Sequence, residues 1–223
     1  MLQTKSLKEL SDNREPIKWA VPGLLPVGIT ALCGKPKVGK TWLALDLCLY
    51  ATTGRRFLGY ETGDADALFI SLDTNQKAIL SAVNNLFENV IGDNPDNLFI
   101  TTELSGETTS VNELVEVIEA QMSEHPKLWL VVIDAIGNVK KTEGEVFPPT
   151  KLTQLAIRNN IAIIILVNDT KDNDALYADP VSFVYGKPAI SPLLETLWIL
   201  GEHEGKRTLK VIGSYLDKEL TVE

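Results

Sequence analysis

The sequence predicts an α/β protein with a mostly parallel central sheet and helices on both faces. Apolar runs of strand length alternate along the chain with longer segments whose apolar residues recur at helical spacing. The main strand-like runs are apolar throughout, as in parallel strands that are buried on both faces. A length of 223 residues suffices for one such domain and is short for two. We therefore expect one domain over residues 27–223, preceded by an N-terminal arm of residues 1–26.

Apolar runs and turn signals indicate the order of the expected elements. Strands are expected at residues 28–33, 67–72, 98–101, 128–134, 161–167, 196–200 and 208–213, with a turn at 204–205 between the last two. Helices are expected directly after residue 40 and at residues 76–91, 111–123 and 149–160. One apolar stripe in the 111–123 helix is interpreted as core packing and consists of Val111, Leu114, Val115 and Ile118. Two segments without a regular pattern, residues 137–148 and 170–191, leave the carboxyl ends of buried strands, where open α/β sheets bind ligands.

The composition indicates an ordinary globular protein, with 44% hydrophobic and 23% charged residues. No apolar run approaches the roughly 20 residues of a membrane span, and the N-terminus lacks the apolar core of a secretion signal. Cys33 and Cys48 lie in apolar contexts without metal-binding or redox spacing, which favours buried, reduced thiols. His125 and His203 are isolated, which argues against a metal cluster. We therefore expect a cytoplasmic protein without membrane contact.

The net charge of −9 is unevenly distributed. Between Lys77 and Lys127 the chain has no lysine or arginine and nine acidic residues. We interpret this stretch as a solvated helix face. An acidic flank of this kind would also repel nucleic acid on its side of the molecule.

The segment between the first expected strand and helix matches a phosphate-binding loop. Gly34 and Gly39-Lys40-Thr41 have the spacing G-x-x-x-x-G-K-[ST]. Glycines allow successive backbone N–H groups to converge on phosphate oxygens, and the helix dipole attracts the same anion. We expect Lys40 to reach the outer phosphates of ATP or ADP and Thr41 to lie on Mg²⁺. The remaining expected contact residues are Lys35, Pro36, Lys37, Val38 and Trp42, although packing of Trp42 beneath the loop is favoured over contact with the base.

Polar residues that end other buried strands are the expected partners of this loop. Asp134 ends an apolar strand and is interpreted as the carboxylate that holds Mg²⁺. Ala135 follows it, so a general base must come from another strand, and Asp73 is the natural candidate. The alternative for Asp73 is an N-cap of the following helix. Asn168 is either a sensor of the γ-phosphate or a turn residue.

The segment "WAVPGLLPVGITALCGKPKVGKTWLALDLCLYATTG", residues 19–54, resembles the RepA-like branch of the RecA-type P-loop ATPases. This branch has an AAA-type ATP-binding domain and includes ring-shaped hexameric helicases of plasmid replication. The resemblance extends from about Ile17 to Ile212. It implies a RecA-like fold that binds ATP and Mg²⁺ between neighbouring subunits. It also implies that the strand ending at Asn168 lies between those ending at Cys33 and Asp134.

Three positions depart from the pattern of this family. Asp73 stands where the family usually has a glutamate base, and Asn168-Asp169 stands where a His-His pair is frequent. The region of the expected basic finger reads "VIGSYLDKE", residues 211–219, and contains no arginine. Only Lys206 and Arg207, in the preceding turn, could replace the finger that reaches a neighbour's γ-phosphate.

The favoured interpretation is an ATP-binding protein with weak, Mg²⁺-dependent ATPase activity in DNA replication or repair of a plasmid, phage or mobile element. The chain would self-associate into a ring or a smaller oligomer. Direct binding to nucleic acid should be weak or absent, because residues 137–148 carry a charge balance of zero and residues 169–191 one of minus two. A non-hydrolysing, nucleotide-responsive regulatory module is the alternative. A small-molecule kinase is least favoured, because such enzymes clamp phosphates with arginines and this chain has five.

Overall fold

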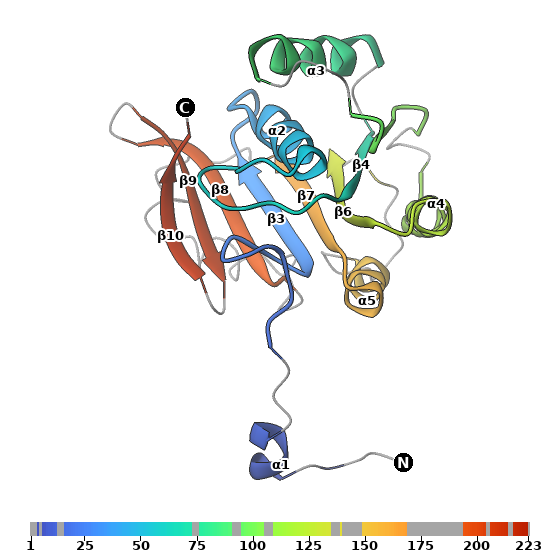
Figure 1. Ribbon diagram of the computed structural model, residues 1–223, viewed down its shortest axis with the longest axis vertical. Coiled ribbons are helices and arrows are strands. Elements are labelled where there is room, and N and C mark those ends of the chain that lie inside the picture. Colours follow the sequence, from blue (N-terminus) through green and yellow to red (C-terminus); the bar gives the residue numbers. More distant parts are fainter. Residues whose placement is uncertain are drawn as a thin grey trace.

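The structure is a computed structural model that describes residues 4, 6–12, 16–72, 76–90, 95–104, 109–134, 139, 149–168, 194–203, 206–213 and 216–222. Its centre is an eight-stranded sheet in the order β10-β9-β8-β3-β7-β6-β4-β5 (Figure 1). The strands are β3 Gly28–Gly34, β4 Asp66–Ser71, β5 Leu98–Thr101, β6 Leu128–Asp134, β7 Ala162–Asn168, β8 Thr196–His203, β9 Lys206–Gly213 and β10 Leu216–Thr221. The helices are α1 Leu7–Asp12, α2 Lys40–Thr53, α3 Gln76–Val90, α4 Val111–Glu124 and α5 Thr150–Asn159. A separate two-stranded sheet pairs β1, Trp19–Val21, with β2, Leu25–Pro26.

Neighbouring strands from β5 to β8 are all parallel, and the β8–β9 and β9–β10 pairs are antiparallel. The expected mostly parallel sheet is therefore confirmed. The strand ending at Asn168, β7, lies between β3 and β6, as the resemblance implied. Because parallel strands end at the same edge of a sheet, the residues that follow β3, β6 and β7 are brought together there.

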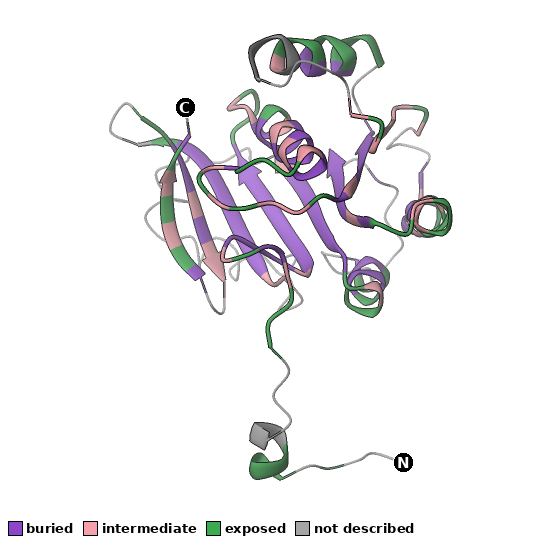
Figure 2. Ribbon diagram, in the orientation of Figure 1, coloured by how far each residue is buried: buried purple, intermediate pink, exposed green. Residues whose placement is uncertain are grey.

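Helices cover both faces of the sheet, which appears as a largely buried layer in Figure 2. On one face α2 and α3 pack against a core that includes Phe69, Val132 and Ile164. On the other face α4 and α5 pack against a core that includes Leu68 and Val131. Adjacent residues of one strand enter opposite cores because side chains alternate across a strand. Burial on both faces explains why these strands read as continuous apolar runs.

The expected packing stripe of α4 is confirmed: Val111, Leu114 and Ile118 are buried, and Val115 packs against the same core. The opposite side of this helix carries exposed glutamates. Glu119 forms an ion pair of 2.5 Å with Arg158 of α5. The part of the acidic stretch that forms α4 is thus a solvated helix face, as expected.

Four regular elements were absent from the expectations: α1, β1, β2 and β10. β10 has the burial pattern Beieie, in which polar residues alternate with partly buried ones at the sheet edge. It lacks the apolar run that identifies a central strand, and an edge position explains this. In the six-residue α1, the described side chains of Leu7, Lys8 and Glu9 are exposed, and Ser6 exchanges hydrogen bonds with Glu9 at the start of the helix. The turn at 204–205 lies outside the described residues.

The segment before β3 contributes apolar side chains to the main core. Val21, Leu24 and Leu25 are buried, and the turn between them has Gly23 at a φ of +74°. The Lys218 ammonium of β10 donates a hydrogen bond of 2.8 Å to the carbonyl oxygen of Gly23. The domain boundary at residue 27 stays a prediction. None of the described helices is both long and apolar enough to cross a membrane.

Candidate functional site

The glycine-rich segment from Gly34 to Thr41 turns at the carboxyl edge of the sheet, between β3 and α2. An ideal Cβ on Gly34 would lie 2.5 Å from the carbonyl oxygen of Leu200 in β8, so no larger residue fits there without a backbone shift. Gly39 has a φ of +103°, in a region that L side chains rarely adopt. The two glycines of the motif are therefore required for different reasons, one by close approach and the other by backbone conformation.

Helix α2 begins at Lys40, directly after this loop. Gly39 is its N-cap and makes no side-chain cap hydrogen bond. The first N–H groups of a helix lack partners within the helix and form the positive end of its dipole. A helix start of this kind, preceded by a tight glycine loop, is suited to an anion.

The side chain of Lys40 folds over its own loop. Its ammonium donates hydrogen bonds of 2.9 Å each to the carbonyl oxygens of Gly34 and Lys35. Only 6% of the residue is exposed. The charge is thus held above the loop rather than extended into solvent. Lys35, Pro36 and Lys37 are exposed, and Val38 packs against the main core.

The next residue, Thr41, is joined to a carboxylate from another strand. Its hydroxyl donates a hydrogen bond of 2.7 Å to Oδ2 of Asp134, the last residue of β6. Asp134 is 7% exposed. Hydroxyl and carboxylate oxygens are the donors that Mg²⁺ prefers, and this ion usually keeps several waters and binds substrate phosphates. The described residues contain no group of three or more His, Cys, Asp or Glu that could hold a metal by itself, so the oxygen pair fits a nucleotide-bound Mg²⁺ better than a protein-enclosed metal.

Arg207 lies beside Gly39 of the loop. An ideal Cβ on Gly39 would be 3.3 Å from Nη2 of Arg207 and 3.5 Å from both Nη1 and Cζ. Arg207 belongs to β9, whose partner β8 is the neighbour of β3. The sequence identified this arginine only as a replacement for a finger that reaches a neighbouring subunit. Its place beside the loop of its own chain was not predicted, because it depends on the pairing of strands that are distant in sequence.

Trp42 lies in the first turn of α2, and the preference for packing beneath the loop over contact with the base stays a prediction. The residue is 40% exposed. Four residues later, Asp46 is mostly buried, and this burial raises its pKa to about 6. The face of α2 that carries these two residues is less completely packed than the opposite face, where Ala44 and Ala51 are buried.

The other expected site residues are only partly described. Asp73 lies outside the described residues. Asn168 is the last residue of β7 and pairs in register with Gly34, so its backbone is at the same edge as the loop; its side chain is not described. Most of the two irregular segments also falls outside the described residues.

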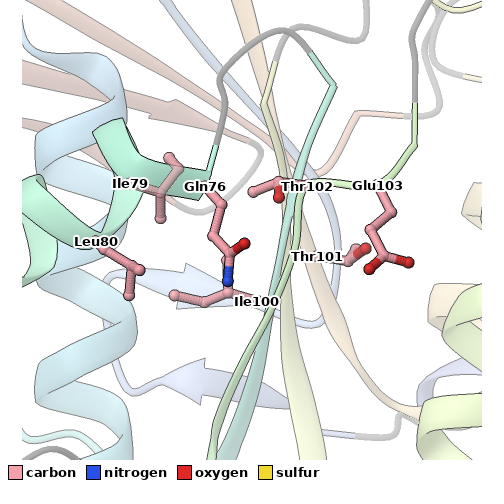
Figure 3. Close-up of a pocket in the computed structure, with 7 residues that line it drawn as sticks. All are labelled: Gln76, Ile79, Leu80, Ile100, Thr101, Thr102 and Glu103. Carbon is pink, nitrogen blue, oxygen red and sulfur yellow. The ribbon is translucent and has the colours of Figure 1, made fainter.

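A small pocket of about 130 Å³ lies elsewhere, between the start of α3 and the end of β5 (Figure 3). Apolar side chains of Ile79, Leu80 and Ile100 line it together with polar ones. Neither Lys40 nor Asp134 belongs to its lining. The pocket is separate from the glycine-rich loop, and the sequence did not indicate it.

A parallel sheet with a glycine-rich loop at its carboxyl edge, a buried lysine, and a threonine paired to a strand-ending aspartate defines the class of P-loop nucleotide-binding proteins. A family profile described as an AAA domain matches residues 1–146. The match covers more than half of the chain, and the chain belongs to this family of AAA domains. The fold is RecA-like, and the family indicates a nucleotide-binding, ATPase-type domain. No curated protein matches the chain.

Proposed function

We propose that this protein binds ATP with Mg²⁺ at the Gly34–Thr41 loop and hydrolyses it slowly. The observation that carries the proposal is the hydrogen bond of 2.7 Å between Thr41 and Asp134, directly after the loop. A threonine hydroxyl and a strand-ending carboxylate at this spacing are the two groups with which P-loop proteins hold the metal of the nucleotide. The metal supplies positive charge to the phosphates.

Each group of the loop has a distinct part in binding. The backbone N–H groups of Lys35 and of residues 37–41, at the loop and the start of α2, would surround the phosphates. Lys40 would exchange its two carbonyl partners for phosphate oxygens, which are stronger acceptors because they are charged. Its short contacts with Gly34 and Lys35 keep it close to the place where these oxygens would lie.

Hydrolysis requires two further groups. A base must lie within hydrogen-bond reach of the attacking water, and positive charge must meet the developing charge on the γ-phosphate. We assign the base to Asp73 and the contact with the γ-phosphate to Asn168, whose strand ends beside Gly34. Asp73 is one methylene shorter than the glutamate of the similar ATPases. A slow reaction is therefore expected.

We assign the protein to the RepA-like branch and to DNA replication or repair of a plasmid, phage or mobile element. The support is the resemblance over residues 19–54. Self-association would place a neighbouring subunit beside the nucleotide. Direct binding to DNA should be weak, since the described surface of α4 presents the exposed carboxylates of Glu113, Glu116 and Glu119.

The shorter side chain of Asp73 also favours a second candidate function, a switch that binds nucleotide without turnover. Titration calorimetry with Mg²⁺-ADP and a steady-state ATPase assay, each with and without single-stranded DNA, separate the two. Wild type should bind, and Lys40→Ala should lose most of the affinity. Turnover above the level of Lys40→Ala supports the ATPase, and binding without such turnover supports the switch. Equal nucleotide affinity in wild type and Lys40→Ala would contradict both.

A further inference from the structure

We propose that Arg207 binds the phosphates of the nucleotide held by its own chain, and that it does so in the ground state. This inference rests on the proposed nucleotide site. It differs from a finger that crosses to a neighbouring subunit and acts only on the transition state. The ligand class is a nucleoside di- or triphosphate, and the recognising group is the planar guanidinium.

The flat face of the Arg207 guanidinium lies against Gly39 of the loop. The ideal Cβ position of Gly39 is 3.3–3.5 Å from Nη1, Nη2 and Cζ alike. If the group approached end-on, its central carbon would be clearly more distant than its two nitrogens. The N–H groups at the rim of the plane therefore remain available around the loop. Arginine presents such groups in a fork that matches two phosphate oxygens.

Among the residues that the structure describes, Arg207 has no counter-ion, unlike Arg56 and Arg158. Arg56 is paired with Glu61 and Arg158 with Glu119. Glu202 lies directly opposite Arg207 in the β8–β9 register, yet in the described part of the chain no carboxylate forms an ion pair with Arg207. A cross-strand ion pair would be the ordinary arrangement for two such residues.

The charges around the contact favour an anion at this position. Lys35, Lys37 and Lys40 belong to the same loop, and the positive end of the α2 dipole adds to them. A further cation beside a helix N-terminus is unfavourable unless an anion lies between them. A phosphate chain bound by the loop would supply that anion.

The position of Arg207 is held by the sheet of its own chain. Its carbonyl oxygen accepts a hydrogen bond of 2.9 Å from the N–H of Val222. Its strand pairs with β8 over the full hairpin, and β8 pairs with β3, the strand that leads into the loop. A side chain anchored in this way needs no second subunit to reach the loop.

The test compares three variants by titration calorimetry with Mg²⁺-ADP. Arg207→Ala should weaken binding by about 10- to 100-fold, the usual effect of losing a hydrogen bond to a charged group. Arg207→Lys should recover part of the affinity, because it keeps the charge and loses the fork. Lys206→Ala is the matched control, since it removes the same charge from the adjacent residue, whose side chain points to the opposite face of the strand. It should bind like wild type.

The outcomes distinguish this inference from the proposed function. If wild type binds and Lys40→Ala does not, while Arg207→Ala binds like wild type, the inference fails and the nucleotide site stands. Equal losses of nucleotide affinity in Arg207→Ala and Lys206→Ala would also overturn the inference, because the net charge of the protein would then explain both. If wild type itself binds no nucleotide, both fail. Arg207→Gln provides the same comparison if the alanine variant is not folded by circular dichroism.

Mixed assemblies separate action within a chain from action between chains. Lys40→Ala subunits retain Arg207, and Arg207→Ala subunits retain an intact loop. An arginine that reached a neighbour would restore nucleotide affinity to the Arg207→Ala subunits when the two are mixed. We expect no recovery, and recovery would overturn the inference.

Discussion

The hydroxyl of Thr41 and the carboxylate of Asp134 lie 2.7 Å apart although 93 positions separate them in the chain. Thr41 belongs to the first turn of α2, which follows β3, and Asp134 ends β6. In the sheet, β7 lies between β3 and β6. Their contact joins the phosphate loop to the edge at which the parallel strands end. It is the relationship on which the proposed binding of Mg²⁺ depends.

Replacement of Asp134 should reduce the dependence of nucleotide affinity on Mg²⁺. Asp134→Asn keeps an oxygen that accepts the hydrogen bond of Thr41 and removes the negative charge. The affinity for Mg²⁺-ADP should fall about 10- to 100-fold, as for other groups that orient a metal's ligands, while affinity in EDTA should change little. Thr41→Ser retains the hydroxyl and serves as the control. Calorimetry over a Mg²⁺ series measures both, and an unchanged Mg²⁺ dependence in Asp134→Asn would contradict the assignment.

Any side chain at Gly34 should destabilise the fold. A Cβ would approach the carbonyl oxygen of Leu200 to 2.5 Å and Cγ1 of Val38 to 3.0 Å. We expect Gly34→Ala to lower the free energy of unfolding by about 1–3 kcal/mol, the usual range for forced overpacking, and Gly34→Ser to lower it further.

Gly59 is the matched comparison for this prediction. It has a φ of +84° and nothing within 4 Å of its ideal Cβ. Glycine is therefore favoured at this position by the backbone conformation and not by lack of space. Gly59→Asn should therefore be more stable than Gly59→Ala, since asparagine tolerates the left-handed region. Urea denaturation measures all four variants. A Gly34→Ser variant as stable as wild type would show that the backbone of β8 at Leu200 can move away from the new side chain at no cost.

The length of the side chain at position 73 should limit turnover. If Asp73 is the base, its carboxylate lies about one C–C bond short of the water, and a misplacement on this scale costs up to roughly 100-fold. Asp73→Glu should raise kcat and leave nucleotide affinity nearly unchanged, and Asp73→Asn should abolish turnover. A steady-state ATPase assay measures both. Were the glutamate variant no faster and the asparagine variant no slower, Asp73 would be a helix cap.

Asp46 should make stability depend on pH. Burial raises the pKa of this carboxyl from 3.8 to about 6 in the folded protein, so the folded state favours the protonated form. The stability that the protonated Asp46 carboxyl contributes is fully present below its pKa in the unfolded chain. This stability is lost as the pH rises through about 6, its pKa in the folded protein. Asp46→Asn, which resembles the neutral form, should stabilise the protein by about 1 kcal/mol at pH 8, after allowance for partial exposure.

The same substitution should have little effect at pH 4, where the wild-type carboxyl is already largely protonated. Melting temperatures at the two pH values provide the measurement. Exposed Asp217 offers a control, because Asp217→Asn removes the same charge from an edge strand. Equal stabilisation by the two substitutions at pH 8 would show that net charge, rather than burial of Asp46, is responsible.

Much of the sheet could be predicted because its strands carry a local signal. β5 and β6 have the expected bounds, β3 is longer by one residue at its end, and β7 is shifted by one residue at both ends. β3, β6 and β7 lie inside the sheet, are buried on both faces and read as apolar runs. β10 has no such run, because one side of it faces solvent. Its place in the sheet depends on pairing with β9, which local periodicity does not record.

The glycine-rich loop, the strand before it and the helix after it were determined by the sequence alone. Gly39 needs a positive φ, Gly34 ends an apolar strand, and helical spacing begins directly afterwards; all three are properties of consecutive residues. The exposure of Trp42 and the place of Arg207 beside Gly39 were decided only by the tertiary structure. Both depend on which strands become neighbours and on which faces are then covered. Strand order results from the packing of the whole chain, because contacts between distant residues are selected by their combined burial rather than by any local pattern.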